Sequence, residues 1–265
     1  MRRLLLAAAL VAVAHGAQAA DMPDLPFLRG SMSDAPAARP NWQGFYVGGQ
    51  AGYGVSDMNF TNSTQGAVAK LLANTTIESQ EAVSTWPLLG RQSVHGHGYG
   101  GFVGYNSQWE DVVLGIEANY MHGTFGGSDS DAMRRIFTTS DNVVNDITYQ
   151  ADGSIKVKDI GSSRLRAGYV WNSFMPYMFG AVSLGQADIV RTATISGTQN
   201  GVAFRPLSSS EIQNNHFLYG YGGGLGIDMM LVGGLFVRAE WEYLKFAAPI
   251  NTSVSTARAG LGYKF

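Results

Sequence analysis

The amino-acid sequence predicts an all-β fold, an eight-stranded antiparallel up-and-down transmembrane β-barrel. Three observations lead to this prediction: a glycine-rich composition with few charges, stretches in which apolar and polar residues alternate, and connections that are long and short in turn. Of the 265 residues, 34 are glycine, 11% are aromatic and 14% are charged, whereas about 25% of a typical soluble domain is charged. Such a composition favours a sheet protein whose surface lies only partly in water.

The cysteine count and the net charge exclude several classes of function. The chain has no cysteine, which excludes a disulfide scaffold, thiolate metal sites and a thiol nucleophile. With a formal net charge of −2, the chain lacks the excess of basic residues that is typical of a nucleic-acid-binding protein. We therefore expect no nucleic-acid partner and no thiolate-bound metal. As a separate expectation, the sequence gives no reason to assign another metal or a cofactor.

The first residues have the pattern of a secretory signal peptide. Arg2 and Arg3 precede an apolar run from Leu4 to Ala14, and Ala17-Gln18-Ala19 forms a small-residue cleavage pattern. The run is too short for a membrane-spanning helix, which needs about 20 residues. The predicted organisation is a cleaved Sec signal peptide at 1–19, a Pro-rich periplasmic linker at 20–41 and a barrel at 42–265.

The first four strands are predicted where residues alternate with a period of two, at 44–55, 97–109, 112–121 and 163–171. In the first two stretches, aromatic residues and valine alternate with glycine and polar residues. The third is the clearest, because Val112, Leu114 and Ile116 lie on one face and Glu117 lies on the other. The fourth, SRLRAGYVW, sets arginine and glycine against leucine, alanine and tyrosine.

The last four strands are predicted at 176–185, 216–229, 235–244 and 257–265. The stretch PYMFGAVSLG is ambiguous, because apolar residues fall on both of its faces. The next, HFLYGYGGGLGIDM, sets aromatic and aliphatic residues against glycine, and LFVRAEWEYL sets them against arginine and glutamate. The terminal stretch ARAGLGYKF alternates up to Phe265.

The connections between these strands alternate in length. About 40 residues separate the first two strands, and long connections recur at 123–158 and 187–215, with short ones around 108–111, 172–175 and 230–234. This is the layout of an outer-membrane barrel, which has short periplasmic turns and long extracellular loops.

The chemistry of the two faces predicts which side contacts lipid. Aromatic residues cluster near the strand ends, where they would form two interfacial girdles, and aliphatic residues lie between them. The opposite face carries the charges, so we expect a polar lumen, although the sequence alone also allows the inverted arrangement of a soluble barrel. Paired opposite charges would plug the lumen; the predicted network is Glu117, Arg164, Arg166, Arg238, Glu240, Glu242 and Arg258.

The stretches NWQGFYVGGQAGYG and ARAGLGYKF resemble the first and last strands of the small alphaproteobacterial outer-membrane β-barrel proteins, a family of porin-like surface antigens. The resemblance covers about 42–265 and implies a location in the outer membrane of a Gram-negative bacterium. It also implies that Tyr263 and Phe265 form the C-terminal assembly signal read by the barrel-assembly machinery. Periplasmic chaperones, outer-membrane lipid and lipopolysaccharide are the other partners that the resemblance implies.

The sequence favours a structural role in envelope integrity rather than an enzymatic one. Three alternatives stay open: a porin-like small-solute channel, a haemin-binding surface receptor and, least favoured, a lipid A-modifying enzyme. Haemin binding is suggested by relatives in the resembled family, with His95 and His97 as weak candidate ligands at the rim.

Overall fold

The computed structural model describes residues 40–265. The predicted signal peptide at 1–19 and nearly all of the linker at 20–41 lie outside the described residues. Within the described part, no helix is both long and apolar enough to cross a membrane.

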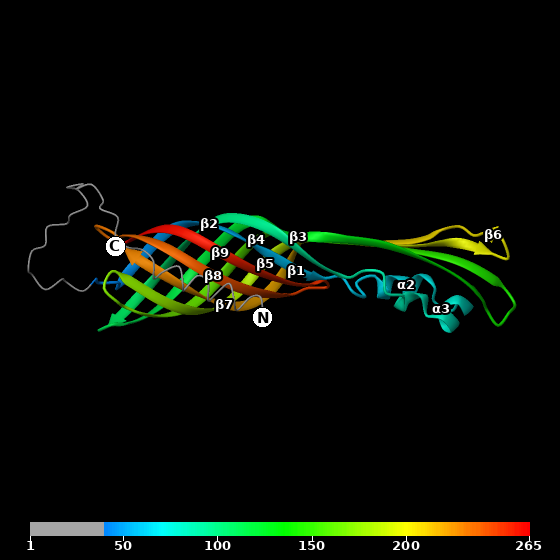
Figure 1. The fold of residues 1–265 in the computed structure, drawn as a ribbon, viewed down its shortest axis with the longest axis horizontal. Helices are drawn as coiled ribbons and strands as arrows, with labels where there is room; N and C mark the ends of the chain where they lie inside the picture. Colours follow the sequence, from blue (N-terminus) through cyan, green and yellow to red (C-terminus); the bar gives the residue numbers. More distant parts are fainter. Residues whose placement is uncertain (1–39) are drawn as a thin grey trace, which may run out of the picture. The chain divides into compact units, whose positions relative to one another are not determined.

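The fold is an antiparallel sheet that closes into a ring (Figure 1). Its nine strands are β1 (Gly44–Asn59), β2 (Arg91–Trp109), β3 (Val112–Thr138), β4 (Val144–Tyr169), β5 (Phe174–Gln199), β6 (Val202–Ala203), β7 (Leu207–Met230), β8 (Leu235–Ala247) and β9 (Asn251–Lys264). Eight of them follow one another around the ring, in the order β4-β3-β2-β1-β9-β8-β7-β5, and the β4–β5 pairing closes it. The two-residue strand β6 pairs only with the far end of β5. The predicted all-β barrel is thus confirmed.

The two faces of the barrel wall differ sharply in exposure. On β4, Leu165 is 71% exposed, whereas its neighbours Arg164 and Arg166 are 1% and 4% exposed. The same alternation runs through β1, β3, β5, β8 and β9, with aromatic and aliphatic side chains outward. The inverted arrangement is therefore wrong, because the apolar face is the outer wall.

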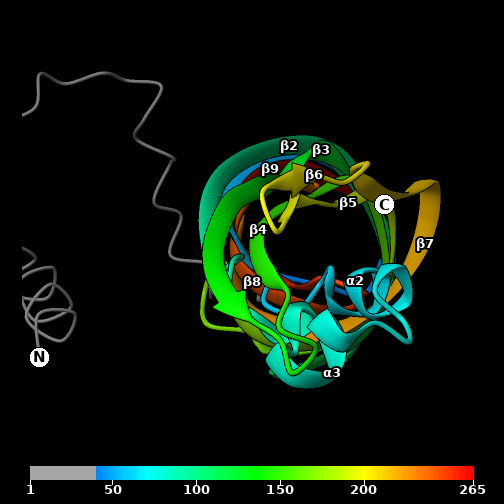
Figure 2. The same cartoon turned by 90° about the vertical axis from the view of Figure 1, so that its right-hand side faces the viewer.

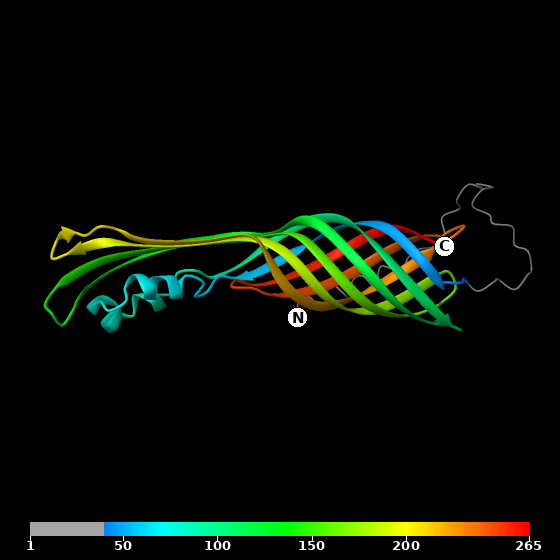
Figure 3. The same ribbon diagram turned by 180° about the vertical axis from the view of Figure 1, so that it is seen from behind.

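The long connections after β3 and β5 are not irregular loops. The β3–β4 ladder continues to the pair Thr138–Val144, and the β4–β5 ladder continues to Asn145–Gln199. Four strands therefore extend well beyond the barrel as an open sheet, called here the extension (Figures 1 and 3). The expectation of loops at 123–158 and 187–215 was wrong, because the alternation continues there with polar rather than lipid-compatible residues on the outer face.

A set of β-bulges lies where the barrel passes into the extension. The register shifts after His122 on β3, after Val157 on β4 and after Ala187 on β5. Phe125, Val157 and Ala187 are paired in one row across these strands, so the bulges lie at one level. Bulges bend strands and increase their twist, which suits the change from a closed wall to an open sheet.

The chemistry of the sheet reverses at this level. Inside the barrel the inner face of β4 carries Arg164 and Arg166, but beyond the bulge it carries Ile155 and Ile147, which are 1% exposed or less. The outer face changes in the opposite sense, from leucine and alanine to lysine, serine, aspartate and glutamine. An apolar outer wall suits lipid and a polar outer wall suits water, so the reversal marks the membrane boundary.

The connection between β1 and β2 folds into a cap on the inner face of the extension. It contains α2 (Gln65–Leu71), α3 (Thr76–Glu81) and the 3₁₀ helix η1 (Val83–Thr85), which lie beyond the barrel end (Figures 1 and 2). The side chains of Phe60, Val68 and Val83 are fully buried. The Thr64 and Tyr149 hydroxyls are 2.7 Å apart and hydrogen-bonded, and burial raises the pKa of the Tyr149 phenol.

The exposed position of Leu165 yields a first prediction. It lies four residues from Tyr169 at the strand end, so at about 3.3 Å per residue and ~40° tilt it stands roughly 10 Å inside an apolar band of ~25 Å. We expect Leu165→Arg to lower the free energy of unfolding by about 2–4 kcal/mol in phospholipid vesicles, measured by guanidinium titration. Tyr169→Arg, near the interface, should cost only about 0–1 kcal/mol, and equal losses would contradict the placement of Leu165 in lipid.

Candidate functional site

The lumen of the barrel holds a compact network of eight ionisable side chains. Four are guanidinium groups and four are carboxylates, and each residue is at most 5% exposed. They are Glu117 on β3, Arg164 and Arg166 on β4, Asp228 on β7, Arg238, Glu240 and Glu242 on β8, and Arg258 on β9. The strands place them together because alternate residues of every strand point inward. The formal charges of this lumen network balance.

Arg164 is at the centre of the half of the network that lies nearer the extension. Its Nη1 donates to Glu240 Oε1 at 2.8 Å and to Glu117 Oε1 at 3.2 Å, and its Nη2 donates to Glu242 Oε1 at 2.6 Å. Arg258 donates to the other oxygen of Glu242 and lies 3.8 Å from Glu240 Oε1. One carboxylate, Glu242, is thus shared by two guanidinium groups.

Arg238 and Arg166 make up the other half of the network. Arg238 donates to Asp228 through Nε at 2.9 Å and Nη2 at 3.1 Å, and to Glu117 through Nη1 at 2.7 Å. Arg166 reaches the same two carboxylates, with Nη2 2.7 Å from Asp228 Oδ2 and Nη1 3.3 Å from Glu117 Oε2. Glu117 therefore joins the two halves, because it accepts from Arg164, Arg166 and Arg238.

Aromatic rings pack against the guanidinium groups. Arg166 lies 3.8 Å from the ring centroid of Tyr177, and Arg238 lies 4.0 Å from that of Phe102. The Tyr177 hydroxyl also donates to Glu240 at 2.9 Å. A cation over a ring face is attracted by the ring quadrupole, and this attraction strengthens when the site is desolvated.

Glycine makes room for these rings at two points. A Cβ atom on Gly226 would lie 2.3 Å from the Tyr177 ring, and one on Gly104 would lie 2.3 Å from the Tyr46 hydroxyl. Neither distance is compatible with a side chain in the present packing. The Tyr46 hydroxyl occupies this space, donating to Glu117 at 2.9 Å and accepting from Arg166 at 3.0 Å.

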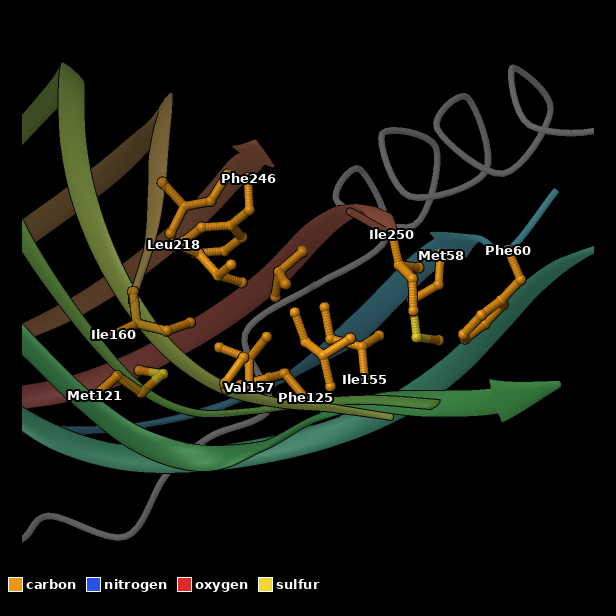
Figure 4. Packing of buried hydrophobic residues seen from close by; sticks show 14 of the residues in the cluster. Met58, Phe60, Met121, Phe125, Ile155, Val157, Ile160, Leu218, Phe246 and Ile250 are labelled. Atoms are coloured by element: carbon orange, nitrogen blue, oxygen red, sulfur yellow. The ribbon is translucent and has the colours of Figure 1, made fainter. Parts of the chain in front are cut away.

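Apolar layers lie on both sides of the charges. Toward the short-turn end, the rings of Trp42 and Phe236 meet edge to face at 5.8 Å. Toward the extension lies a layer of buried apolar side chains, which includes Met121, Ile160, Leu218 and Phe246 (Figure 4). Leu244, the next inward residue after Glu242 on β8, is also buried. This layer continues into the core beneath the cap.

The structure brings together all seven of the sequence-predicted lumen residues. The prediction missed Asp228, Tyr46 and Tyr177, although all three lie on strands that it contained. Asp228 could have been found, since it ends the glycine-rich face of the predicted strand 216–229. Tyr177 lies in the stretch where apolar residues fill both faces, so its alternation gave no signal.

The candidate haemin ligands lie apart from this network. His95 and His97 are exposed on the outer wall of β2, and the His95 ring stacks on Tyr53 with 5.5 Å between centroids. Among residues 40–265, no group of three or more His, Cys, Asp or Glu side chains could hold a metal ion.

The predicted assembly signal lies at the opposite end of the wall. The Tyr263 and Phe265 rings are 5.2 Å apart, and Phe265 is 72% exposed. The Phe265 backbone N–H donates to the carbonyl of Phe45 at 2.9 Å, which extends the pairing of β9 with β1 to the last residue.

The sequence is similar to known outer-membrane proteins. Residues 4–265 match the family model of the outer membrane protein beta-barrel domain. A 25 kDa outer-membrane immunogenic protein of Brucella ovis is 25% identical over 166 residues, which are 63% of this chain and 62% of that protein. The chain thus spans less than two thirds of this relative.

Two solved structures are similar as well. Neisserial surface protein A aligns with a TM-score of 0.36 and 12% identity, over 83% of this chain and 97% of its own. Ail, the attachment invasion locus protein of Yersinia pestis, aligns with a TM-score of 0.31 and 16% identity, over 84% of this chain and 99% of its own. Since the family model matches nearly the whole sequence, this chain belongs to the outer membrane protein beta-barrel domain family.

Proposed function

We propose that the protein is a structural component of the outer membrane whose lumen is closed and whose extension presents a folded cap at the cell surface. The observation that carries this proposal is the balanced lumen network between two apolar layers. An eight-stranded barrel has an interior just wide enough for side chains to fill. A lumen filled by paired charges and covered by apolar side chains offers no continuous aqueous path for a solute.

The network also favours a single register of the strands in the barrel. Shifting a strand by one residue would turn its inward charges toward lipid and its apolar residues into the lumen. A charged residue at the bilayer midplane costs about 2–4 kcal/mol in a barrel. The charges therefore disfavour every odd shift of β3, β4, β8 or β9, whatever the net energy of each ion pair.

The exposed pair Tyr263 and Phe265 supports an assembly role for the chain end. Its rings project from the outer wall at the end of β9, the last strand, where a partner could reach them before β9 pairs with β1. We propose that the barrel-assembly machinery recognises this pair after periplasmic chaperones deliver the chain.

Electrical recording tests the closed lumen. Wild-type protein reconstituted into a planar lipid bilayer should give no discrete conductance steps, because the apolar layers exclude hydrated ions. Heat-modifiable migration of the same sample on gels would establish that the barrel is inserted. Reproducible steps from inserted protein would overturn the proposal in favour of the porin-like channel.

Removing one shared carboxylate tests the network. Glu242→Gln leaves Arg164 and Arg258 each short of a charged partner, and breaking a buried pair typically costs about 3–5 kcal/mol. We expect a loss of this size in the free energy of unfolding from vesicles. Glu211→Gln removes a carboxylate from the exposed pair with Arg191 and should cost at most about 1 kcal/mol; similar losses in both variants would count against a structural role for the network.

Changing the last residue tests the assembly signal. Deletion of Phe265 should reduce the heat-modifiable protein in the outer-membrane fraction several-fold, with unfolded chain accumulating in the periplasm. Phe265→Tyr keeps the aromatic ring and should insert normally. Normal insertion of the deletion variant would refute the sorting role.

A further inference from the structure

A cavity lies on the barrel at the end nearer the extension, among β1, β2, β8 and β9. Its volume is about 430 Å³, and the side chains that line it are almost all polar. Two of them, Arg91 and Lys245, are cations, and Asp57 is its single carboxylate. It is separate from the lumen network, whose members do not line it.

The strand register fixes the height of this cavity relative to the aromatic girdle. Lys245, Ser253, Asp57 and Ser93 are paired in one row across the four strands. Directly paired residues share a face of the sheet. On β8 this row is the next outward position beyond Tyr243, so the cavity begins immediately above the girdle.

Arg91 belongs to the row above, where it is paired with Asn59, which is paired in turn with Asn251. Tyrosine and tryptophan girdles mark the level of the lipid headgroups. The two cations therefore stand at the level where the headgroups of the outer leaflet lie, and the apolar wall that holds acyl chains lies directly below them.

The charges of the cavity are available to a ligand. Within the described residues neither Arg91 nor Lys245 has an ion pair or a side-chain hydrogen bond, whereas Asp57 accepts from the Ser93 hydroxyl. The Asn59 amide oxygen accepts from the Thr61 backbone N–H, which leaves the Asn59 NH₂ group free to donate. Two unpaired cations and nearby amide donors complement an anion that carries hydroxyl groups.

We propose that this cavity binds the phosphorylated sugar headgroup of an outer-leaflet glycolipid. The guanidinium of Arg91 donates to two phosphate oxygens in the bidentate manner of arginine. Lys245 contributes a point charge from β8, on the other side of β1 and β9. Asn59 and Asn251 bind sugar hydroxyls, and the acyl chains lie along the outer wall of β1 and β9. This inference goes beyond the proposed closed barrel and does not depend on the state of the lumen.

Lipid binding by the folded protein tests the site. Wild-type protein and Arg91→Gln/Lys245→Gln would be titrated with lipid A in zwitterionic bicelles, and bound lipid measured by native mass spectrometry. Each cation near an anionic surface contributes enough to change affinity roughly fivefold, so the double variant should bind about 30-fold more weakly. Dephosphorylated lipid A should bind wild type no better than it binds the variant.

A matched control separates the effect of net charge on lipid A binding from the effect of the site residues. Lys156→Gln/Arg205→Gln removes two exposed cations outside the cavity and should bind lipid A like wild type. Equal binding by the Arg91/Lys245 variant and wild type would overturn the proposal, as would equal loss in the control. Inorganic phosphate that displaces lipid A at equal concentration would show a free-phosphate site and overturn the lipid assignment. Unchanged heat-modifiable migration would establish that both variants are folded.

Discussion

Charge neutrality inside a closed wall is the constraint on which the rest of this structure depends. A sheet in a bilayer must pair every backbone group, which only a closed barrel achieves, and its inward residues are then cut off from lipid and from bulk water alike. Buried charges are tolerated there only when they are paired and hydrogen-bonded. Four guanidinium groups and four carboxylates meet this condition, because Glu117 and Glu242 each serve more than one arginine. The aromatic rings and the glycines beside them follow from the same need, since they fill and shape the remaining space.

One continuous sheet in this protein suits lipid in the barrel and water in the extension. In the barrel its apolar face is outward, and in the extension its apolar face is inward beneath the cap. The bulges in the row of Phe125, Val157 and Ala187 separate the barrel from the extension without ending any of the strands. The extension then needs its own cover, which the helices between β1 and β2 supply. Membrane and surface parts are therefore built on continuous backbone ladders rather than on a barrel with appended loops.

Much of this arrangement could be predicted from alternation alone. Period-two patterns located the eight ring strands and the face on which Arg164, Arg238 and Glu240 lie. The pattern could not show which residues meet across the lumen, because that depends on the stagger of the strands around the ring. Arg164 contacts β8 residues that are more than 70 positions away, a contact that no local signal specifies.

Other features were missed although the sequence carries a signal for them. The stretch ITYQADGSIKV alternates strictly, with isoleucine, tyrosine and valine on one face, but its polar face is unlike a lipid-facing wall. A capping pattern, Thr75-x-x-Glu78, also begins α3, and the Thr75 hydroxyl accepts from the Glu78 backbone N–H at 3.2 Å. Both segments depart from the chemistry of a membrane strand, so the search for membrane strands predicts loops there although each segment has regular structure.

The extension also sets how far the protein stands off from the membrane. Strand β3 continues from Phe125 to Thr138 beyond the bulges, and at about 3.3 Å per residue this length corresponds to roughly 45 Å. That reach exceeds the thickness of the hydrocarbon core itself, which is about 30 Å. With the extension facing outward, as proposed, a macromolecule approaching the cell would meet the tip and the cap before it met the barrel rim. Residues near the strand turns at the tip would thus be contacted from outside before the residues of the ring.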